Sequence, residues 1–247
     1  MGFKTAAWGP HAWVTLGGLL QAMDQYMKDH PNKSEALRTQ AVQLARSLTF
    51  ILPCEFCRTS VVGFLNEPAT SITKEDTRSL SSWFYQVRQR VNWKLFQEDV
   101  KEWSNSTPPQ QNDALWLKWW GYQPVESEVV YPLPSTLEWW QHAVHFHNYV
   151  LCDFPDPTTE VERHASVSGD YWRLLHELLT TVALNVVPQS LPRLPITHDG
   201  RFAWLYGWHI RVVTTLPSLC LLPLEDVPKV YCEFNKGVCN IYRKSCS

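Results

Sequence analysis

The chain has 247 residues, of which 45% are hydrophobic and 19% are charged, and its formal net charge is −2. This composition is typical of a folded globular protein and excludes a disordered one. The small net charge gives no reason to expect nucleic acid or an anionic membrane as a partner. No apolar run reaches the roughly 18 residues that a membrane span needs. The first ten residues also lack the apolar segment of a secretory signal.

The first hundred residues have the periodicity of amphipathic helices. Pro10 predicts a helix start, because proline is tolerated in a first helical turn, and His30-Pro31 predicts its end. A second helix is expected from Ser34, and a capping pattern at Thr73 with Asp76 predicts another. The three apolar stripes are Trp13, Leu16, Leu20, Met23 and Met27; Leu37, Ala41, Leu44 and Leu48; and Trp83, Val87, Val91 and Leu95.

Strand-like alternation is scarce along the chain, so the sequence predicts an all-α helical bundle. Two Pro-rich stretches, residues 106–111 and 124–135, predict loops, and the second divides the chain. We expect one helical unit in residues 1–105 and a second in residues 135–247. The thirteen tryptophans suggest stacked aromatic helix faces or a planar cofactor, although most are expected to be core residues.

The seven cysteines fall into three sets. They are the Cys54–Cys57 CxxC pair, the isolated Cys152 and Cys220, and the C-terminal Cys232, Cys239 and Cys246, which recur every seven residues. An odd count without a secretory signal argues against a purely structural disulfide framework. Redox or metal chemistry is the better expectation.

The CxxC pair favours redox chemistry over a metal site. Two cysteines at the start of a helix can form a reducible disulfide, and the helix N-terminus lowers the pKa of the first thiol. Such a pair exchanges electrons through mixed disulfides. Zinc would need two further ligands, and neither a second CxxC nor paired histidines lie near. A thioredoxin-like fold would need a strand before the motif, whereas Pro53-Cys54 follows an amphipathic helix.

Three motifs carry a resemblance to a known family. They are Trp8-Gly9-Pro10 with Trp13, then Pro53-Cys54-Glu55-Phe56-Cys57, then Trp83-Phe84-Tyr85 leading to Val91-Asn92-Trp93-Lys94-Leu95. In this order and approximate spacing, residues 8 to about 100 resemble the Erv/ALR sulfhydryl oxidases.

The resemblance implies a four-helix bundle, with a short fifth helix, that binds FAD beside the CxxC. Cys54 would accept electrons from protein thiols. Cys57 would pass them to the flavin, and molecular oxygen would reoxidise it to give hydrogen peroxide. The implied flavin contacts are Trp8, Gly9 and Trp13 from the first motif, and Val91, Asn92 and Lys94 from the last. Core packing alone would also explain Trp13 and Val91, and Lys94 could be a surface residue.

The chain departs from the family pattern at two histidines. Gly17 stands where one is expected, and Arg88-Gln89 replaces a His-Asn pair. The guanidinium of Arg88 could replace one histidine in the FAD site by stacking on adenine or pairing with a phosphate. Gly17 offers no side chain at all.

The second half resembles the first in two helices. Residues 172–179 match residues 13–20 at one Trp and three Leu positions, and residues 204–216 match residues 83–95. This pattern predicts a degenerate repeat without a CxxC, so that one chain would mimic a two-subunit assembly. A homodimer, or chance similarity between two Trp-bearing helices, is the alternative.

Two other groups of residues remain open to interpretation. His142, His145 and His147 precede Asn148 and either contribute a His-Asn pair to a flavin pocket or form a structural cluster; no metal site is expected. The tail cysteines Cys232, Cys239 and Cys246 either shuttle electrons to the CxxC or form a structural disulfide with Cys220.

Two functions follow. The first is an FAD-dependent sulfhydryl oxidase acting on protein thiols, which the intact CxxC favours. The second is a catalytically silent relative retained as a structural or assembly subunit, which the lost histidines favour. The resemblance implies the mitochondrial intermembrane space, or the cytoplasmic factories or virions of large DNA viruses, as compartments.

Overall fold

The computed structural model describes residues 5–104, 130–153, 161–183, 198–213, 221–227 and 229–233. Within these ranges the chain is helical and contains no strand, which confirms the expected all-α class. None of the described helices is long and apolar enough to cross a membrane. The α-helices are α1 (Thr5–Asp29), α2 (Ser34–Ile51), α3 (Glu55–Leu65), α4 (Leu80–Ser104), α6 (Leu137–Asp153), α7 (Val161–Val182) and α8 (His198–Val213), with a 3-10 turn at Pro31–Lys33 and a π-helical turn at Lys229–Glu233.

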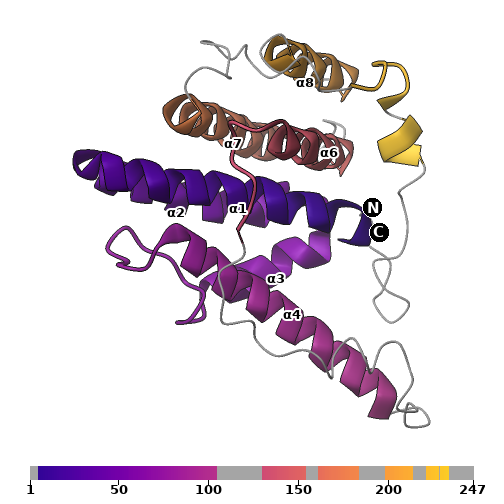
Figure 1. Cartoon of the computed structure of the whole chain (residues 1–247). Helices are drawn as coiled ribbons and strands as arrows, with labels where there is room; N and C mark the ends of the chain where they lie inside the picture. Colours follow the sequence, from indigo (N-terminus) through magenta and orange to yellow (C-terminus); the bar gives the residue numbers. More distant parts are fainter. Residues whose placement is uncertain are drawn as a thin grey trace.

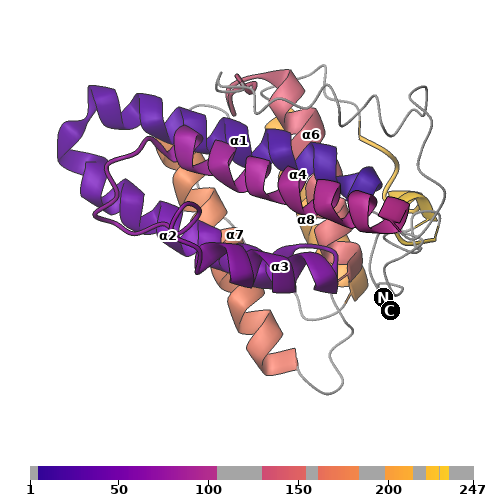
Figure 2. The same ribbon diagram turned by 90° about the horizontal axis from the view of Figure 1, so that it is seen from below.

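The helices form successive layers (Figure 1). Helices α3 and α4 cover one side of α1 and α2, while α6 and α7 cover the other side, and α8 lies on α6. Figure 2, seen from below, shows α4 lying along α1 and α3 following on from α2. Residues 5–104 thus contain four α-helices, and the expected short fifth helix is not found within that range.

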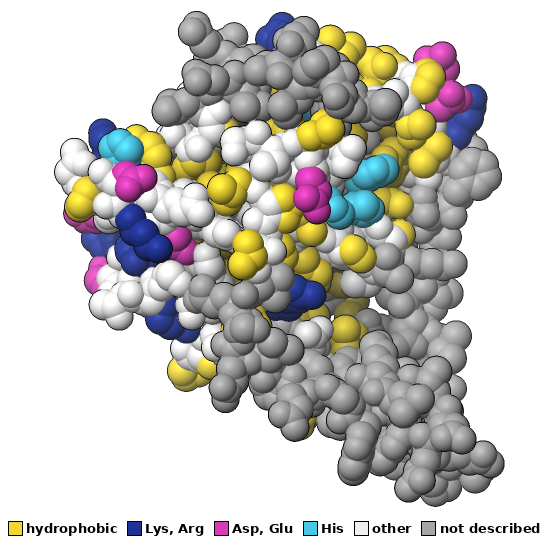
Figure 3. Space-filling model, viewed as in Figure 1, with side chains coloured by type: hydrophobic (Ala, Val, Ile, Leu, Met, Phe, Trp, Pro, Cys, Tyr) yellow, Lys and Arg dark blue, Asp and Glu magenta, His cyan; other side chains and the backbone are white. Residues whose placement is uncertain are grey.

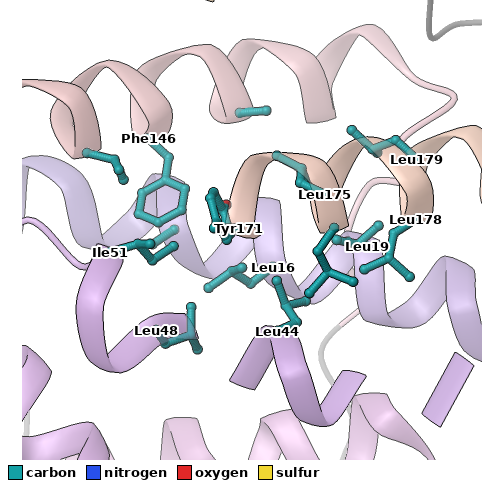
Figure 4. Close-up of a cluster of buried hydrophobic side chains, with 14 of the residues drawn as sticks. Leu16, Leu19, Leu44, Leu48, Ile51, Phe146, Tyr171, Leu175, Leu178 and Leu179 are labelled. Carbon is teal, nitrogen blue, oxygen red and sulfur yellow. The ribbon is translucent and has the colours of Figure 1, made fainter. Parts of the chain in front are cut away.

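The two halves of the chain share one hydrophobic core. Leucine and isoleucine side chains of α1 and α2 point toward Phe146 of α6 and the apolar face of α7 (Figure 4). Because each fully buried side chain of this size contributes roughly 1.5–3 kcal/mol, this contact holds the second half firmly on the first. The side chains labelled there are Leu16, Leu19, Leu44, Leu48, Ile51, Phe146, Tyr171, Leu175, Leu178 and Leu179.

Most of the predicted helix boundaries in the first half are confirmed. Helix α1 ends at Asp29, α2 begins at Ser34 and ends just before Leu52-Pro53, and α3 begins directly after Cys54. One start is wrong, because α1 already begins at Thr5 and Pro10 lies inside it. Pro10 is the sixth residue of α1, and because it has no N–H group it leaves the helix one backbone hydrogen bond short in its second turn.

The predicted cap of α4 is also wrong. The helix begins at Leu80 rather than near Thr73, and its first backbone N–H groups are bound by a residue of α1. Leu80 N donates to Asp24 Oδ1 and Ser81 N to Asp24 Oδ2, each at 2.8 Å. A carboxylate at a helix N-terminus satisfies free N–H groups and interacts favourably with the helix dipole. Ser79, directly before the helix, also accepts from Ser82 N at 3.0 Å. A local and a distant side chain therefore cap α4 together.

Candidate active site

The CxxC pair lies at the break between α2 and α3. Pro53 interrupts the helix, and Cys54 becomes the N-cap of α3 with extended backbone angles, φ −165° and ψ 113°. The backbone N–H of Cys57 donates to Cys54 Sγ at 3.3 Å. Arg58 Nη1 donates to Leu52 O at 2.6 Å and so ties α3 to the interrupted segment. The helix N-terminus is therefore directed at the sulfur of Cys54, as the sequence predicts.

The two thiols differ in their surroundings. Neither forms a disulfide, but Cys54 is 0% exposed whereas Cys57 is partly exposed. A hydrogen bond with the Cys54 thiol, together with burial, raises the pKa of Cys57, and the hydroxyl of Thr5 and the charge of Lys94 act in the opposite direction. Thr5 Oγ1 lies 3.7 Å from Cys57 Sγ. The thiol of Cys57 is therefore protonated at neutral pH.

A cavity of about 480 Å³ opens beside Cys57 between α1, the end of α2, α3 and α4. Its volume falls within the roughly 300–1,000 Å³ of small-molecule and cofactor sites, which are also mainly apolar. The wall is rich in aromatic side chains, namely Trp8, Trp13, Phe56, Phe64 and Phe84.

All six residues that the family motifs assign to flavin contact line this one cavity together with Cys57. Helix α1 contributes the first three and α4 the last three. They are Trp8, Gly9, Trp13, Val91, Asn92 and Lys94. Two motifs far apart in the sequence therefore meet at the same wall.

The cavity also explains which members of the apolar stripes stay partly exposed. On α1, Leu20 and Met23 are 1% and 0% exposed, but Trp13 is only partly buried. On α4, Trp83 is 2% exposed, whereas Val91 remains partly exposed. Both Trp13 and Val91 face the cavity. Their exposure thus marks a gap of ligand size in an otherwise closed core.

Polar side chains also stand in the apolar wall, among them Lys94 and Asn92. Lys94 Nζ donates to Ser60 Oγ at 2.5 Å and lies 3.8 Å from the ring centroid of Phe56. Lys94 is therefore part of the cavity wall rather than a fully solvated surface residue. The amide of Asn92 makes no hydrogen bond within the described part of the chain, so it is available to a bound molecule.

Arg88 does not line the cavity. Its Nη1 donates to the hydroxyl of Tyr131 at 2.9 Å, and its guanidinium lies 5.9 Å from the ring centroid of Trp13. A Cβ atom on Gly17 would lie 2.4 Å from the ring of Tyr131. Gly17 and Arg88, at which the chain departs from the family pattern, therefore both lie against Tyr131, a residue that no sequence motif singles out.

The histidines of α6 lie away from the cavity. His147 is fully buried, its Nε2 lies 3.0 Å from the Tyr171 hydroxyl, and burial lowers its pKa well below the usual value. His142 and His145 pack against His11 of α1, with 3.0 Å between the Nδ1 atoms of His11 and His142. Histidine side chains also gather into one group on the face seen in Figure 3. This geometry supports the structural interpretation.

No metal centre is evident in the described ranges, where no three His, Cys, Asp or Glu side chains are arranged to hold an ion. Cys152 is disulfide-bonded, although it stands apart from the other cysteines in the sequence. Its partner is not among the described side chains. The tail cysteines Cys232, Cys239 and Cys246, and also Cys220, lie outside the described side chains as well.

The proposed repeat relates helices with different neighbours. Helix α4 packs mainly against α1, whereas α8, its expected counterpart, packs mainly against α6 rather than α7. The matched tryptophans nevertheless meet, because the Trp172 and Trp204 rings lie 5.3 Å apart, edge to face.

Comparisons with protein-family models, with curated proteins and with solved structures found no match to this chain. The functional conclusion therefore depends on the site itself.

Proposed function

We propose that the chain is an FAD-dependent sulfhydryl oxidase that converts protein thiols into disulfides. The observation that carries the proposal is that Cys57 shares a cavity of about 480 Å³ with six residues that the family motifs assign to flavin contact. The order of the motifs and the geometry of the folded chain are separate lines of argument, and they select the same residues.

The residues of the wall fit a flavin. Trp8, Trp13 and Phe84 offer aromatic surfaces to a planar ring system. The amide of Asn92 can hydrogen-bond polar ring or ribose groups, and the ammonium of Lys94 can pair with a phosphate. FAD would thus lie between α1 and α4, with Cys57 at its edge.

The thiols would act by disulfide exchange. A client thiolate would attack the Cys54–Cys57 disulfide and form a mixed disulfide, which a second client thiol would resolve. The client then holds the new disulfide, and Cys54 and Cys57 hold two electrons and two protons as thiols. The helix N-terminus stabilises negative charge on Cys54 Sγ, while Cys57 retains its proton. When bound, FAD would oxidise this dithiol and deliver its electrons to molecular oxygen, giving hydrogen peroxide.

One observation favours the second candidate, a catalytically silent relative that serves as a structural or assembly subunit. Cys54 is 0% exposed, so a protein thiol cannot touch its sulfur in this conformation. An active oxidase would have to uncover Cys54 during each cycle. In either case, the packing of α6 and α7 on α1 and α2 would let one chain replace a two-subunit assembly.

The visible absorption spectrum of the purified protein, followed by oxygen uptake with dithiothreitol, tests the proposal. We expect a flavin band, and oxygen uptake that disappears in Cys57→Ser but persists in Thr59→Ser, a conservative change on the exposed side of the same helix. A folded, colourless protein that does not take up added FAD would overturn the oxidase and leave the assembly subunit.

A further inference from the structure

Helix α1 carries two adjacent glycines where residues 130–134 cross it. A Cβ on Gly17 would lie 2.4 Å from two ring carbons of Tyr131, and a Cβ on Gly18 would lie 2.1 Å from the backbone oxygen of Pro132. Real Cβ atoms do not approach other atoms this closely. The two glycines therefore form a notch that receives Tyr131 and the following backbone.

Hydrogen bonds fix this segment on both sides of the notch. Tyr131 N donates to Gln21 Oε1 at 3.0 Å, and the indole of Trp139, at the start of α6, donates to Thr15 O at 3.0 Å. Trp139 is 0% exposed. The segment is thus attached to α1 both by its backbone and by a buried side chain. These contacts hold Tyr131 in the notch.

Tyr131 supports the cavity wall from behind. Its ring packs edge to face on Phe84, with centroids 6.4 Å apart, and its hydroxyl accepts a hydrogen bond from Arg88. Arg88 in turn lies over Trp13, and the rings of Trp13 and Phe84 are 5.2 Å apart. Trp13 and Phe84 both line the cavity. One residue outside the four-helix unit therefore contacts or braces both aromatic side chains.

We propose that Tyr131 is a positioning residue for the cofactor cavity. Seated in the Gly17–Gly18 notch, it holds Phe84 directly and Trp13 through Arg88, and so fixes the aromatic surfaces against which the cofactor is placed. The segment leading into α6 thereby completes a site whose other residues belong to α1–α4. The identity of the cofactor as FAD rests on the proposed function, whereas the bracing of the wall does not.

The test uses two variants with matched controls in the full-length protein. Tyr131→Phe removes the hydroxyl that binds Arg88 and keeps the ring, and Gly17→Ala displaces the ring. Tyr85→Phe is the control for the hydroxyl, because the buried Tyr85 hydroxyl makes no hydrogen bond to any residue that the structure describes. Gly63→Ala is the control for the glycine, because a Cβ there meets nothing within 4 Å. The readouts are the dissociation constant for FAD added to the cofactor-free protein, and the alkylation rate of Cys57, measured by peptide mass spectrometry.

We expect Tyr131→Phe to weaken FAD binding about threefold to tenfold, the effect of one hydrogen bond, and Gly17→Ala to weaken it further. Gly17→Ala should also speed alkylation of Cys57 in the cofactor-free protein, and both controls should match the wild type. If the wild type binds FAD and the two variants behave like their controls, the positioning role is overturned and the oxidase stands. If the wild type binds no FAD, the proposed function fails, and the alkylation rate of Gly17→Ala against Gly63→Ala still decides whether Tyr131 braces the wall.

Discussion

The two halves of the molecule use aromatic side chains in opposite ways. In α6–α8 the tryptophans pack on one another edge to face, as in Trp140–Trp208 at 5.6 Å and Trp172–Trp204 at 5.3 Å. Each of these four is at most 9% exposed. The pocket in this half, lined by His209 and Tyr231, has a volume of only about 60 Å³. In α1–α4, by contrast, Trp13 borders a cavity of about 480 Å³.

The comparison shows that tryptophan has different roles in the two halves. A tryptophan on an amphipathic helix predicts burial in both halves, but only the fold decides whether its ring meets protein or empty volume. Among the described residues of the second half, edge-to-face packing buries the tryptophan rings against one another. The half that carries the CxxC therefore has the space for a cofactor, and the other half supplies packing.

The largest expected effect comes from removing one tryptophan from each half. Trp172→Ala should lower the free energy of unfolding by about 3–5 kcal/mol, because a fully packed ring leaves a void; Trp172 is 2% exposed and contacts His147, Trp204 and Trp208. Trp13→Ala should cost clearly less in the cofactor-free protein, since its ring already borders a cavity. Urea denaturation measures both, and equal losses would contradict the comparison.

A second pair of substitutions compares glycines. Gly18→Ala should destabilise the protein by about 1–3 kcal/mol, because the new methyl group is forced against the backbone of Pro132. Gly207→Ala in α8 should stabilise it by roughly 0.5–1 kcal/mol, since a Cβ there meets nothing within 4 Å and alanine favours the helix. Thermal unfolding followed by circular dichroism gives the two signs. A stable Gly18→Ala protein would mean that residues 130–134 are not held on α1.

The helices could be predicted because their determinants are local. The stripe Leu37 to Leu48 is buried as its spacing predicts, and Pro53 ends α2 where expected. The cap of α4 could be predicted only in part. Ser79, which accepts from Ser82 N, is a local cap, whereas Asp24, which accepts from Leu80 N, lies 56 residues before Leu80. No capping pattern in the sequence near Thr73 can report a partner on another helix.

In the candidate site, too, some residues could be predicted from local motifs and others depend on tertiary packing. The resemblance to the family motifs was sufficient to name six wall residues, because each motif is a short local pattern within one helix. The contacts of Arg88 depend on Tyr131, which reaches the site only through tertiary packing, and the full burial of Cys54 depends on how the helices assemble. Phe56 and Phe84 also line the cavity. In the sequence only their neighbours, Cys57 and Trp83, point to them.

A smaller effect is expected where α1 of the first half meets α6 of the second. Burial and the neighbouring His145 and His142 lower the pKa of His11 to about 4, and burial lowers the pKa of both neighbours. Since the unfolded chain takes up these protons near pH 6.5 and the folded protein does not, stability is complete above pH 6.5. It is lost as the pH falls from about 6.5 toward 4.

His11→Gln should make this loss shallower, by up to about 1.4 kcal/mol per pH unit for one titrating group. Urea denaturation between pH 7 and pH 4 measures the slope. His30→Gln is the control, because His30 is an exposed residue stacked on Tyr26. An unchanged slope in His11→Gln would assign the acid sensitivity to the buried His147 and His209, whose pKa values are also lowered by burial.

The smallest expected effect compares one ion pair from each half. Arg90 binds Glu67 through two hydrogen bonds of 2.6 and 2.8 Å, with its guanidinium 5.1 Å from the Phe64 ring centroid. Arg173 and Glu177 form a single exposed contact within α7. Because bidentate geometry and partial burial reduce solvent screening, Glu67→Gln should cost about 1 kcal/mol and Glu177→Gln at most about 0.5 kcal/mol. Double-mutant cycles with Arg90→Gln and Arg173→Gln isolate each pair. Since Phe64 lines the cavity, a coupling energy near zero for Glu67–Arg90 would mean that this pair does not help to hold α4 in place beside α3.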